Sequence, residues 1–177
     1  MKTIFAYIFG IGAMGALFSI YQQSSRKRLI ASKFIADVCW VVHYLCLGAY
    51  GGAIPNFVGI FRELVFMNRE NKKWANYSFW PLVFIIINFL LGLRTFAASI
   101  NLLPILGSAF VTVALWLRKP TLTKIFSFPV STAFLIYDVF VGSWIGVINE
   151  SLAICSIILS FVRKKNTETN ADNHDRS

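Results

Sequence analysis

The stretch HYLCLGAYGGAIPN, residues 43–56, decides the fold that we expect for this chain. It sets a glycine-rich turn between two apolar segments, with His43 before the turn and Asn56 after it. A related stretch, YDVFVGSWIGVINE, follows at residues 137–150. Each stretch has the pattern of two membrane helices that meet in a tight turn, and the recurrence of this pattern indicates a duplicated helical bundle.

The composition predicts an all-α integral membrane protein. Of the 177 residues, 56% are hydrophobic and 14% are charged, whereas about 25% of the residues in a soluble domain are charged. A membrane-spanning helix needs about 20 apolar residues. Seven apolar runs predict seven such helices, of which the third and fourth are short and must borrow flanking residues. The runs are 4–21, 29–50, 53–67, 80–93, 96–117, 122–141 and 144–162.

The basic residues predict how these helices are oriented. All 17 lysines and arginines except Lys2, Arg62 and Arg94 lie in or beside the loops after the first, third and fifth helices, or in the tail. Loops rich in Lys and Arg stay in the cytoplasm, so we expect the N-terminus outside and the C-terminus inside. An odd number of helices agrees with this. The net charge of +9 therefore indicates topology and no nucleic acid partner.

The internal repeat is clearest at a displacement of 94 residues, which superposes Gly48 on Gly142 and Gly52 on Gly146. A displacement of 93 residues pairs Asn56 with Asn149 instead, but it loses both glycine matches. The first register also pairs His43 with Tyr137, Tyr50 with Trp144 and Asn56 with Glu150.

This repeat predicts two parallel triple-helix bundles joined by a linker helix, a 3+1+3 arrangement. Helices one to three recur as five to seven, and a displacement of four crossings keeps both bundles in the same orientation. The expected parts are a first repeat at 1–73, a linker at 74–94, a second repeat at 95–165 and a disordered cytoplasmic tail at 166–177. In transporters built from repeats, the solute site lies between the halves.

Local residues shape three of the predicted helices. Small residues such as Gly10 and Gly15 allow close backbone approach in a membrane, so we expect the first helix to be packed inside the protein. Pro55 fits the first turn of the third helix, where its missing N–H has no partner to lose. Pro104 falls in the middle of the fifth helix and should bend it.

Charged side chains inside the helices leave two interpretations open. Asp37 either pairs with Lys33, one helical turn earlier, or lines a pocket. Arg62 lies beside Glu63 and either pairs with an acid or extends to the lipid headgroups.

Three motifs, WVVHYLCLGAYGG at 40–52, NLLPILGS at 101–108 and GSWIGVINE at 142–150, resemble the YgjV family of bacterial inner-membrane proteins. The resemblance covers most of residues 1–165 and implies a location in the bacterial inner membrane. It also implies an architecture similar to SWEET-type sugar carriers and PnuC-type vitamin-precursor transporters, which bind small solutes between two bundles. In those carriers the third and seventh helices contribute polar residues, often Asn, and the corresponding positions here are Asn56 and either Asn149 or Glu150. Tyr137 stands where a histidine would match His43, so the pair is not symmetric.

Six side chains are candidates for a solute site. His43 could bind a solute, carry a proton or hydrogen-bond a neighbouring helix. A carboxylate near the bilayer centre costs about 2.5–3.5 kcal/mol on insertion scales, so we expect Glu150 to be paired, hydrated or protonated, and proton coupling could run through Glu150 or His43. The six candidates are Trp40, His43, Asn56, Tyr137, Asn149 and Glu150.

The leading hypothesis from the sequence is a small-solute carrier in which the two bundles rock around these residues. Its expected partners are the lipid bilayer and a small-molecule solute, and no cofactor or metal is expected. The alternative is a non-transporting membrane scaffold or sensor, whose polar side chains only join helices. We do not expect an enzyme, because the sequence has no metal-spaced cluster of His or acids, no nucleophile with a base at helical spacing and no glycine-rich phosphate loop. The sequence leaves the oligomeric state open.

Overall fold

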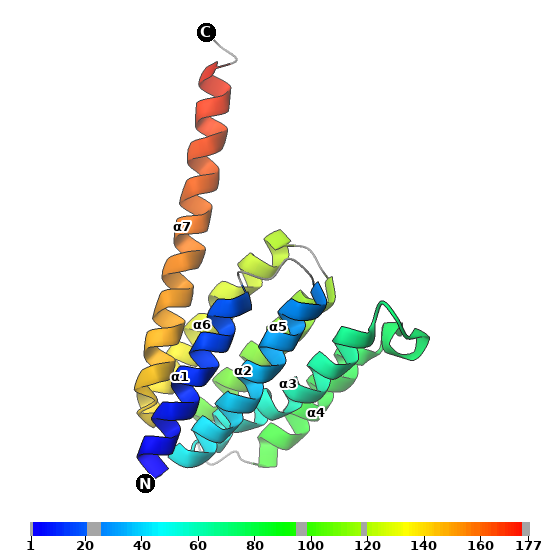
Figure 1. Cartoon of the computed structure of the whole chain (residues 1–177), viewed down its shortest axis with the longest axis vertical. Coiled ribbons are helices and arrows are strands. Elements are labelled where there is room, and N and C mark those ends of the chain that lie inside the picture. The colour runs from blue at the N-terminus through cyan, green and yellow to red at the C-terminus, as the bar shows by residue number, and fades with distance from the viewer. Residues whose placement is uncertain (1, 21–25, 95–98, 118–119, 175–177) are drawn as a thin grey trace.

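The structure, a computed structural model, describes residues 2–20, 26–94, 99–117 and 120–174. These residues form seven α-helices and two short 3₁₀ helices and contain no strand, so the expected all-helical fold is confirmed. The helices run alternately up and down, so that α1 begins at one end of the bundle and α7 leaves it at the other (Figure 1). In chain order the elements are α1 (Lys2–Ile20), α2 (Arg26–Leu47), α3 (Tyr50–Asn68), η1 (Lys73–Asn76), α4 (Trp80–Arg94), η2 (Ser99–Asn101), α5 (Leu102–Leu117), α6 (Pro120–Val141) and α7 (Trp144–His174).

Neighbouring helices pack in chain order within each part of the bundle. α2 lies between α1 and α3, and α6 lies between α5 and α7. α3 also packs against α5, α1 meets α7, and α4 covers α3 and α5. The largest buried apolar cluster is formed by Ala13, Ala36, Trp40, Tyr44, Ala49, Ala53 and Tyr137.

Two tight turns of the same conformation join α2 to α3 and α6 to α7. Gly48 has a φ of +71° and Gly142 a φ of +70°, a left-handed conformation that glycine adopts at little cost. In the first turn the Ala49 N–H donates to the Tyr44 carbonyl at 2.8 Å, and in the second the Ser143 N–H donates to the Asp138 carbonyl at 2.9 Å. Both turns are therefore Schellman motifs, which end one helix and start the next.

Two prolines do not lie where the sequence places them. α5 begins at Leu102, so Pro104 is in its first turn, where no backbone hydrogen bond is lost. The expected mid-helix bend at Pro104 is therefore wrong. α3 begins at Tyr50, three residues before the expected start, because the turn at Gly48 ends α2 early. Pro55 consequently lies inside α3 rather than in its first turn.

The first helix is not an interior helix, contrary to our expectation. Its small residues do form one buried stripe against α2, with Ala6, Gly10 and Ala13 all buried. The remaining faces carry large apolar side chains that are exposed, such as Ile4 at 64% and Ile8 at 58%. Small residues along a single stripe bring one face of a helix close to a neighbour, and the other faces of α1 remain free to meet lipid.

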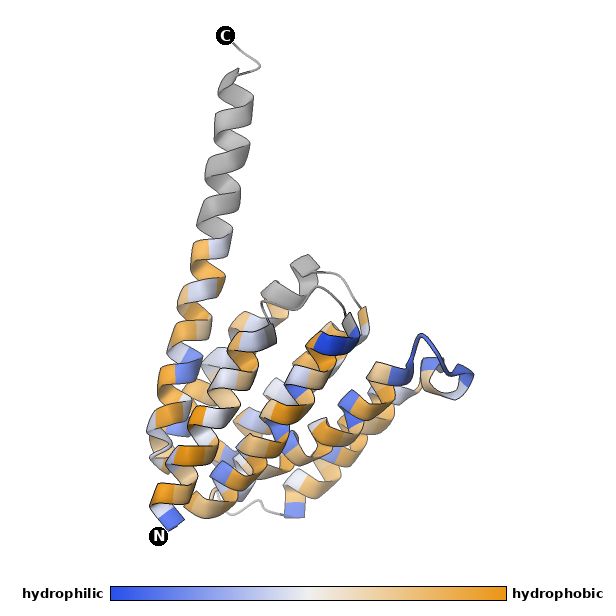
Figure 2. Ribbon diagram, in the orientation of Figure 1, coloured by the Kyte–Doolittle hydropathy of each residue, from blue (hydrophilic) through white to orange (hydrophobic). Residues whose placement is uncertain are grey.

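Large apolar side chains are exposed over much of the outside of the bundle, and hydrophobic residues make up most of its helices (Figure 2). Such a surface would promote aggregation in water, whereas the hydrocarbon core of a bilayer solvates it. Among the described residues, three helices are long and apolar enough to cross a membrane, at Lys2–Ser19, Lys27–Leu47 and Ser99–Leu117. Three shorter apolar helices lie at Trp80–Arg94, Ile125–Val141 and Trp144–Ser160.

α7 projects beyond the rest of the bundle (Figure 1). It continues to His174 and so includes residues 166–174, for which the sequence predicts a disordered tail. Helical hydrogen bonds join residues four apart in the same chain, so a helix can extend in this way without a neighbour.

Candidate functional site

Two buried polar clusters occupy the interior of the bundle. The first, here called the His43 cluster, lies beside the two glycine turns and consists of His43, Tyr44, Tyr137, Asp138 and Ser143. The second, the Arg62 cluster, lies between α2, α3 and α5 and consists of Lys33, Asp37, Arg62, Glu63, Ser108 and Thr112.

His43 joins three parts of the chain. Its Nδ1 lies 2.7 Å from the Ala6 carbonyl of α1, and its Nε2 lies 2.8 Å from the Ser143 hydroxyl. A carbonyl oxygen can only accept, so Nδ1 carries a hydrogen and donates it; in the neutral ring Nε2 then accepts from Ser143. Gly10 provides the space for the ring, because a Cβ at that position would lie 2.8 Å from His43 Nδ1.

Tyr44 and Asp138 form a buried hydrogen bond between α2 and α6. The Tyr44 hydroxyl donates to Asp138 Oδ1 at 2.8 Å. The other carboxylate oxygen, Asp138 Oδ2, is buried without a hydrogen bond of ordinary geometry. Asp37 and Glu63 form ion pairs with Lys33 or Arg62, whereas Asp138 forms none with any described residue.

Tyr137 connects α6 to the start of α3. The Gly52 N–H donates to the Tyr137 hydroxyl at 2.8 Å. Asn56, one helical turn later, donates from Nδ2 to the Gly52 carbonyl at 2.8 Å. Trp40 completes this region, since its ring stacks on Tyr44 with centroids 5.7 Å apart and meets the ring of His43 edge-on.

Asn149 and Glu150 lie near the start of α7. Asn149 Nδ2 donates to Glu150 Oε1 at 2.9 Å. Ser131 of α6 also hydrogen-bonds the Glu150 carboxylate, and Lys33 is close enough to attract it. Of the six predicted site residues, the structure thus brings Trp40, His43 and Tyr137 together and places Asn56 beside them. Asn149 and Glu150 are hydrogen-bonded to each other on α7, where the Glu150 carboxylate is near enough to interact electrostatically with Tyr44 and Asp138. A binding role for any of the six stays a prediction.

The Arg62 cluster is a network of buried charges. Arg62 makes two contacts with Glu63, from Nη2 at 3.0 Å and from Nε at 3.2 Å, and Nη1 donates to Thr112 at 2.9 Å. It also lies 3.7 Å from Asp37 Oδ2, and Lys33 pairs with the same carboxylate. Two positive and two negative groups balance each other, as a membrane interior requires. Arg62 therefore pairs with acids and does not extend to the headgroups.

Three members of the His43 cluster were not among the predicted site residues. Tyr44 and Asp138 are 94 residues apart, so the 94-residue displacement superposes one on the other. The repeat register therefore contained a signal for both residues. Ser143 falls on Ala49 in that register, and nothing in the sequence marks it.

The contact between α3 and α5 extends along both helices. At one end Asn101 of η2, directly before α5, lies against Gly51, and in the middle Arg62 reaches Thr112. At the other end the Arg69 guanidinium lies 3.4 Å from the centroid of the Trp116 ring, and it donates to the Trp116 carbonyl at 2.7 Å.

The contact between α1 and α7 is less extensive. Ile145 lies against Gly10 near the start of α7. Farther along α7 is an open groove of about 470 Å³, lined by Leu152, Cys155, Ser156, Leu159 and Ser160.

An all-helical bundle with an apolar exterior and buried ion pairs defines the class of this molecule as a multi-pass membrane protein. Residues 4–168 match the Imp-YgjV family, described as bacterial inner membrane protein, and the chain belongs to that family. A search of curated proteins found no match, and a search of solved structures found none.

Proposed function

We propose that this inner-membrane protein is a carrier for a small solute and works by rocking of two similar halves, α1–α3 and α5–α7, with α4 as linker. The observation that carries the proposal is the hydrogen bond between Tyr44 and Asp138, two residues that the 94-residue register makes counterparts. A residue that contacts its own counterpart lies at the axis that relates two copies of a unit.

The two glycine turns support the same relation. Gly48 and Gly142 have nearly equal φ angles and the same pattern of hydrogen bonds, and α3 and α7 begin two residues after them. Gly52 and Gly146 are also counterparts: a Cβ at either one would collide with Tyr44 or Asp138, respectively. Parallel repeats in a 3+1+3 arrangement account for these matches, and the likeness to SWEET- and PnuC-type carriers is part of this proposal.

The unequal contacts between the halves favour movement. In a parallel repeat, the α3–α5 contact is the counterpart of the α7–α1 contact. The first is held along its length by the Arg62 cluster and Arg69, whereas the second is less extensive. In the 94-residue register, Lys33, Asp37 and Arg62 fall on Ser127, Ser131 and Ser156. The half that includes the α3–α5 contact therefore has an ionic network, whereas the matching positions of the other half carry hydroxyl groups. We expect the α1–α7 contact to open first.

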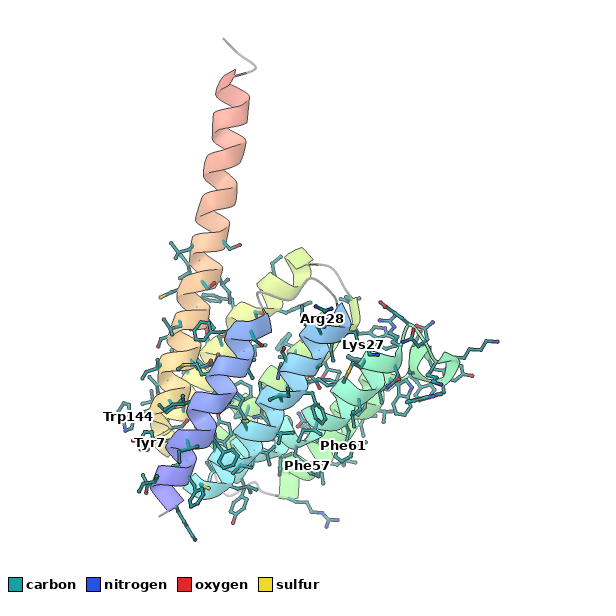
Figure 3. The ribbon with its side chains drawn as sticks, in the orientation of Figure 1. Tyr7, Lys27, Arg28, Phe57, Phe61 and Trp144 are labelled. Atoms are coloured by element: carbon teal, nitrogen blue, oxygen red, sulfur yellow. The ribbon has the colours of Figure 1, made fainter. Side chains whose placement is uncertain are left out.

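The proposed orientation places the N-terminus outside the cell and the C-terminus in the cytoplasm. Lys27 and Arg28 lie at the end of the bundle from which α7 projects, and the aromatic residues Tyr7 and Trp144 lie at the opposite end (Figure 3). Basic residues favour the cytoplasmic side of a membrane. The His43 cluster would then lie toward the outer surface.

A thermal-shift screen of the purified protein against sugars, nucleosides and vitamin precursors tests the proposal, because a ligand that binds the folded state stabilises it. Each hit is then tested for uptake into proteoliposomes. Asn56→Ala and Glu150→Ala should each raise the dissociation constant about 2- to 13-fold, the loss of one hydrogen bond worth about 0.5–1.5 kcal/mol. Phe57→Ala, at an exposed apolar position, is the matched control and should bind normally. If no solute stabilises the protein and none is taken up into liposomes, the carrier proposal is wrong.

The second candidate is a membrane scaffold or sensor, and one observation favours it. His43, Tyr44 and Tyr137 all have hydrogen-bond partners within the protein, as expected for side chains that join helices. In that case substitutions at these positions lower the melting temperature and change no ligand's affinity. Enzymatic activity is not part of either proposal.

A further inference from the structure

The hydrogen bonds that lead from α1 to Asp138 have a fixed direction. The Ala6 carbonyl accepts from His43 Nδ1, which leaves Nε2 of the neutral ring as an acceptor. Ser143 must therefore give its single hydroxyl hydrogen to Nε2, from which it lies 2.8 Å away. The Ser143 oxygen then has only acceptor sites left to offer to any other neighbour.

That neighbour is Asp138. A Cβ at Gly146 would collide with both Asp138 Oδ2 and Ser143 Oγ, so these two oxygens lie next to the same backbone position. Oδ2 is buried and has no hydrogen-bond donor within ordinary geometry. An ionised Oδ2 would face the lone pairs of Ser143 with nothing to stabilise its charge, whereas a protonated Oδ2 would donate to them.

Within the described residues, the elements around Asp138 present no lysine or arginine to its carboxylate. α2 presents His43 and Tyr44, α6 presents Tyr137, and α3 approaches with Gly52. α7 presents Glu150, whose charge is of the same sign, and η2 contains Ser99, Ile100 and Asn101, which are uncharged.

Asp37 provides the contrast within the same protein. It is as deeply buried as Asp138, with no exposed surface, but Lys33 and Arg62 both pair with it. A buried carboxylate with cations can remain ionised, while one without a cation becomes neutral by binding a proton. The two aspartates are therefore expected to differ in charge.

We propose that Asp138, Ser143 and His43 form a proton-binding relay in which Asp138 carries the proton on Oδ2. The proton is donated to Ser143, Ser143 donates to His43 Nε2, and His43 Nδ1 donates to Ala6, so each proton of the relay has an acceptor. Proton binding stands independently of transport. The coupling of this proton to solute movement rests on the proposed carrier function.

The relay can move its proton without changing the number of protons it holds. The Asp138 proton passes to Ser143 Oγ while the Ser143 hydroxyl hydrogen passes to His43 Nε2. The products are an Asp138 carboxylate, a Ser143 hydroxyl that donates to it, and an imidazolium. Because separated ions are costly in a buried site, this form is disfavoured while α1, α2 and the α6–α7 turn stay in contact. Separation of these elements would admit water and release the proton.

Infrared difference spectra of the protein in lipid nanodiscs at neutral pH test the position of the proton. A protonated carboxyl group has a C=O stretching band that a carboxylate lacks. We expect the wild-type band to contain a component that is lost in Asp138→Asn and retained in the matched variant Asp37→Asn. Tyr44→Phe should keep this component and move it to higher frequency, because Asp138 Oδ1 loses its hydrogen bond. A band from which Asp138→Asn removes nothing, or of which Tyr44→Phe moves nothing, overturns the proposal.

A second measurement separates the relay from the carrier function. Once a solute is identified, uptake into liposomes is measured with and without an inward proton gradient. Wild-type uptake should rise with the gradient, and Asp138→Asn should abolish that response. If the infrared band is present and no solute is transported, the relay stands and the carrier proposal fails. If Asp138→Asn keeps the response to the gradient, transport stands and its coupling to Asp138 is wrong.

Discussion

Gly52 shows how a missing side chain organises the His43 cluster. A Cβ at this position would lie 2.8 Å from the Tyr137 ring and 2.9 Å from the Tyr44 ring. Gly52→Ala should therefore force both rings apart and destabilise the fold by about 1–3 kcal/mol, the usual cost of overpacking. Melting temperatures in detergent measure the change. Gly15→Ala is the control, because its Cβ meets nothing within 4 Å and alanine favours a helix. Equal melting temperatures for the two variants would contradict the packing described here.

Arg62 is expected to stabilise the α3–α5 contact only while its acids are present. Arg62→Met leaves Glu63 and Asp37 buried with a single cation, Lys33, and should cost about 3–5 kcal/mol. The double variant Arg62→Met with Glu63→Leu removes a positive and a negative group together, so it should recover most of that loss. Reversible unfolding in mixed micelles gives the free energies. A double variant less stable than Arg62→Met would show that Glu63 does not depend on Arg62.

At the scale of elements, the two Schellman turns should respond alike to substitution. Gly48 and Gly142 have positive φ angles, and a Cβ at either would meet nothing within 4 Å, so the cost of alanine is backbone strain alone. Left-handed backbone costs a residue with a side chain about 1–2 kcal/mol. Gly48→Ala and Gly142→Ala should therefore lower stability by similar amounts, and the asparagine variants by less. A large difference between the two alanine variants would argue against equivalent turns.

The elements could be predicted from the sequence more completely than their ends. Seven apolar runs matched seven helices because lipid-facing helices need long apolar stretches. The end of α2 was missed because three glycines, Gly48, Gly51 and Gly52, could each end a helix. The choice of Gly48 depends on hydrogen bonds back to Leu45 and Tyr44. That choice moved the start of α3 and so put Pro55 inside a helix.

The candidate site was harder to predict than the fold. Sequence patterns relate residues on one helix, such as Trp40 and His43, which are three residues apart and so lie on one face of α2. Ser143 contacts His43, which is 100 residues away in the sequence. The periodicity of a helix cannot predict a contact between residues on different elements. The charge of Arg62 was visible, but its burial depended on α5, which supplies Thr112.

At the scale of the whole molecule, α4 decides whether the two halves are parallel. It has 15 residues, about 22 Å at 1.5 Å per residue, and the hydrocarbon core of a bilayer is about 30 Å thick. If α4 crosses the membrane, α1–α3 and α5–α7 have the same orientation. If it does not, the displacement between them is three crossings and the halves are inverted.

Cysteine labelling at the two ends of α4 tests this directly. Lys72, before η1, and Arg94, the last residue of α4, are both exposed. In a background without Cys39, Cys46 and Cys155, a membrane-impermeant maleimide should label Lys72→Cys from the cytoplasmic side and Arg94→Cys from the outside. Right-side-out and inverted vesicles provide the two sides, and each variant is the control for the other. Labelling of both from one side would mean that α4 does not cross. The 3+1+3 arrangement, the shared axis at Tyr44 and Asp138, and the outward location of the relay would then have to be abandoned together.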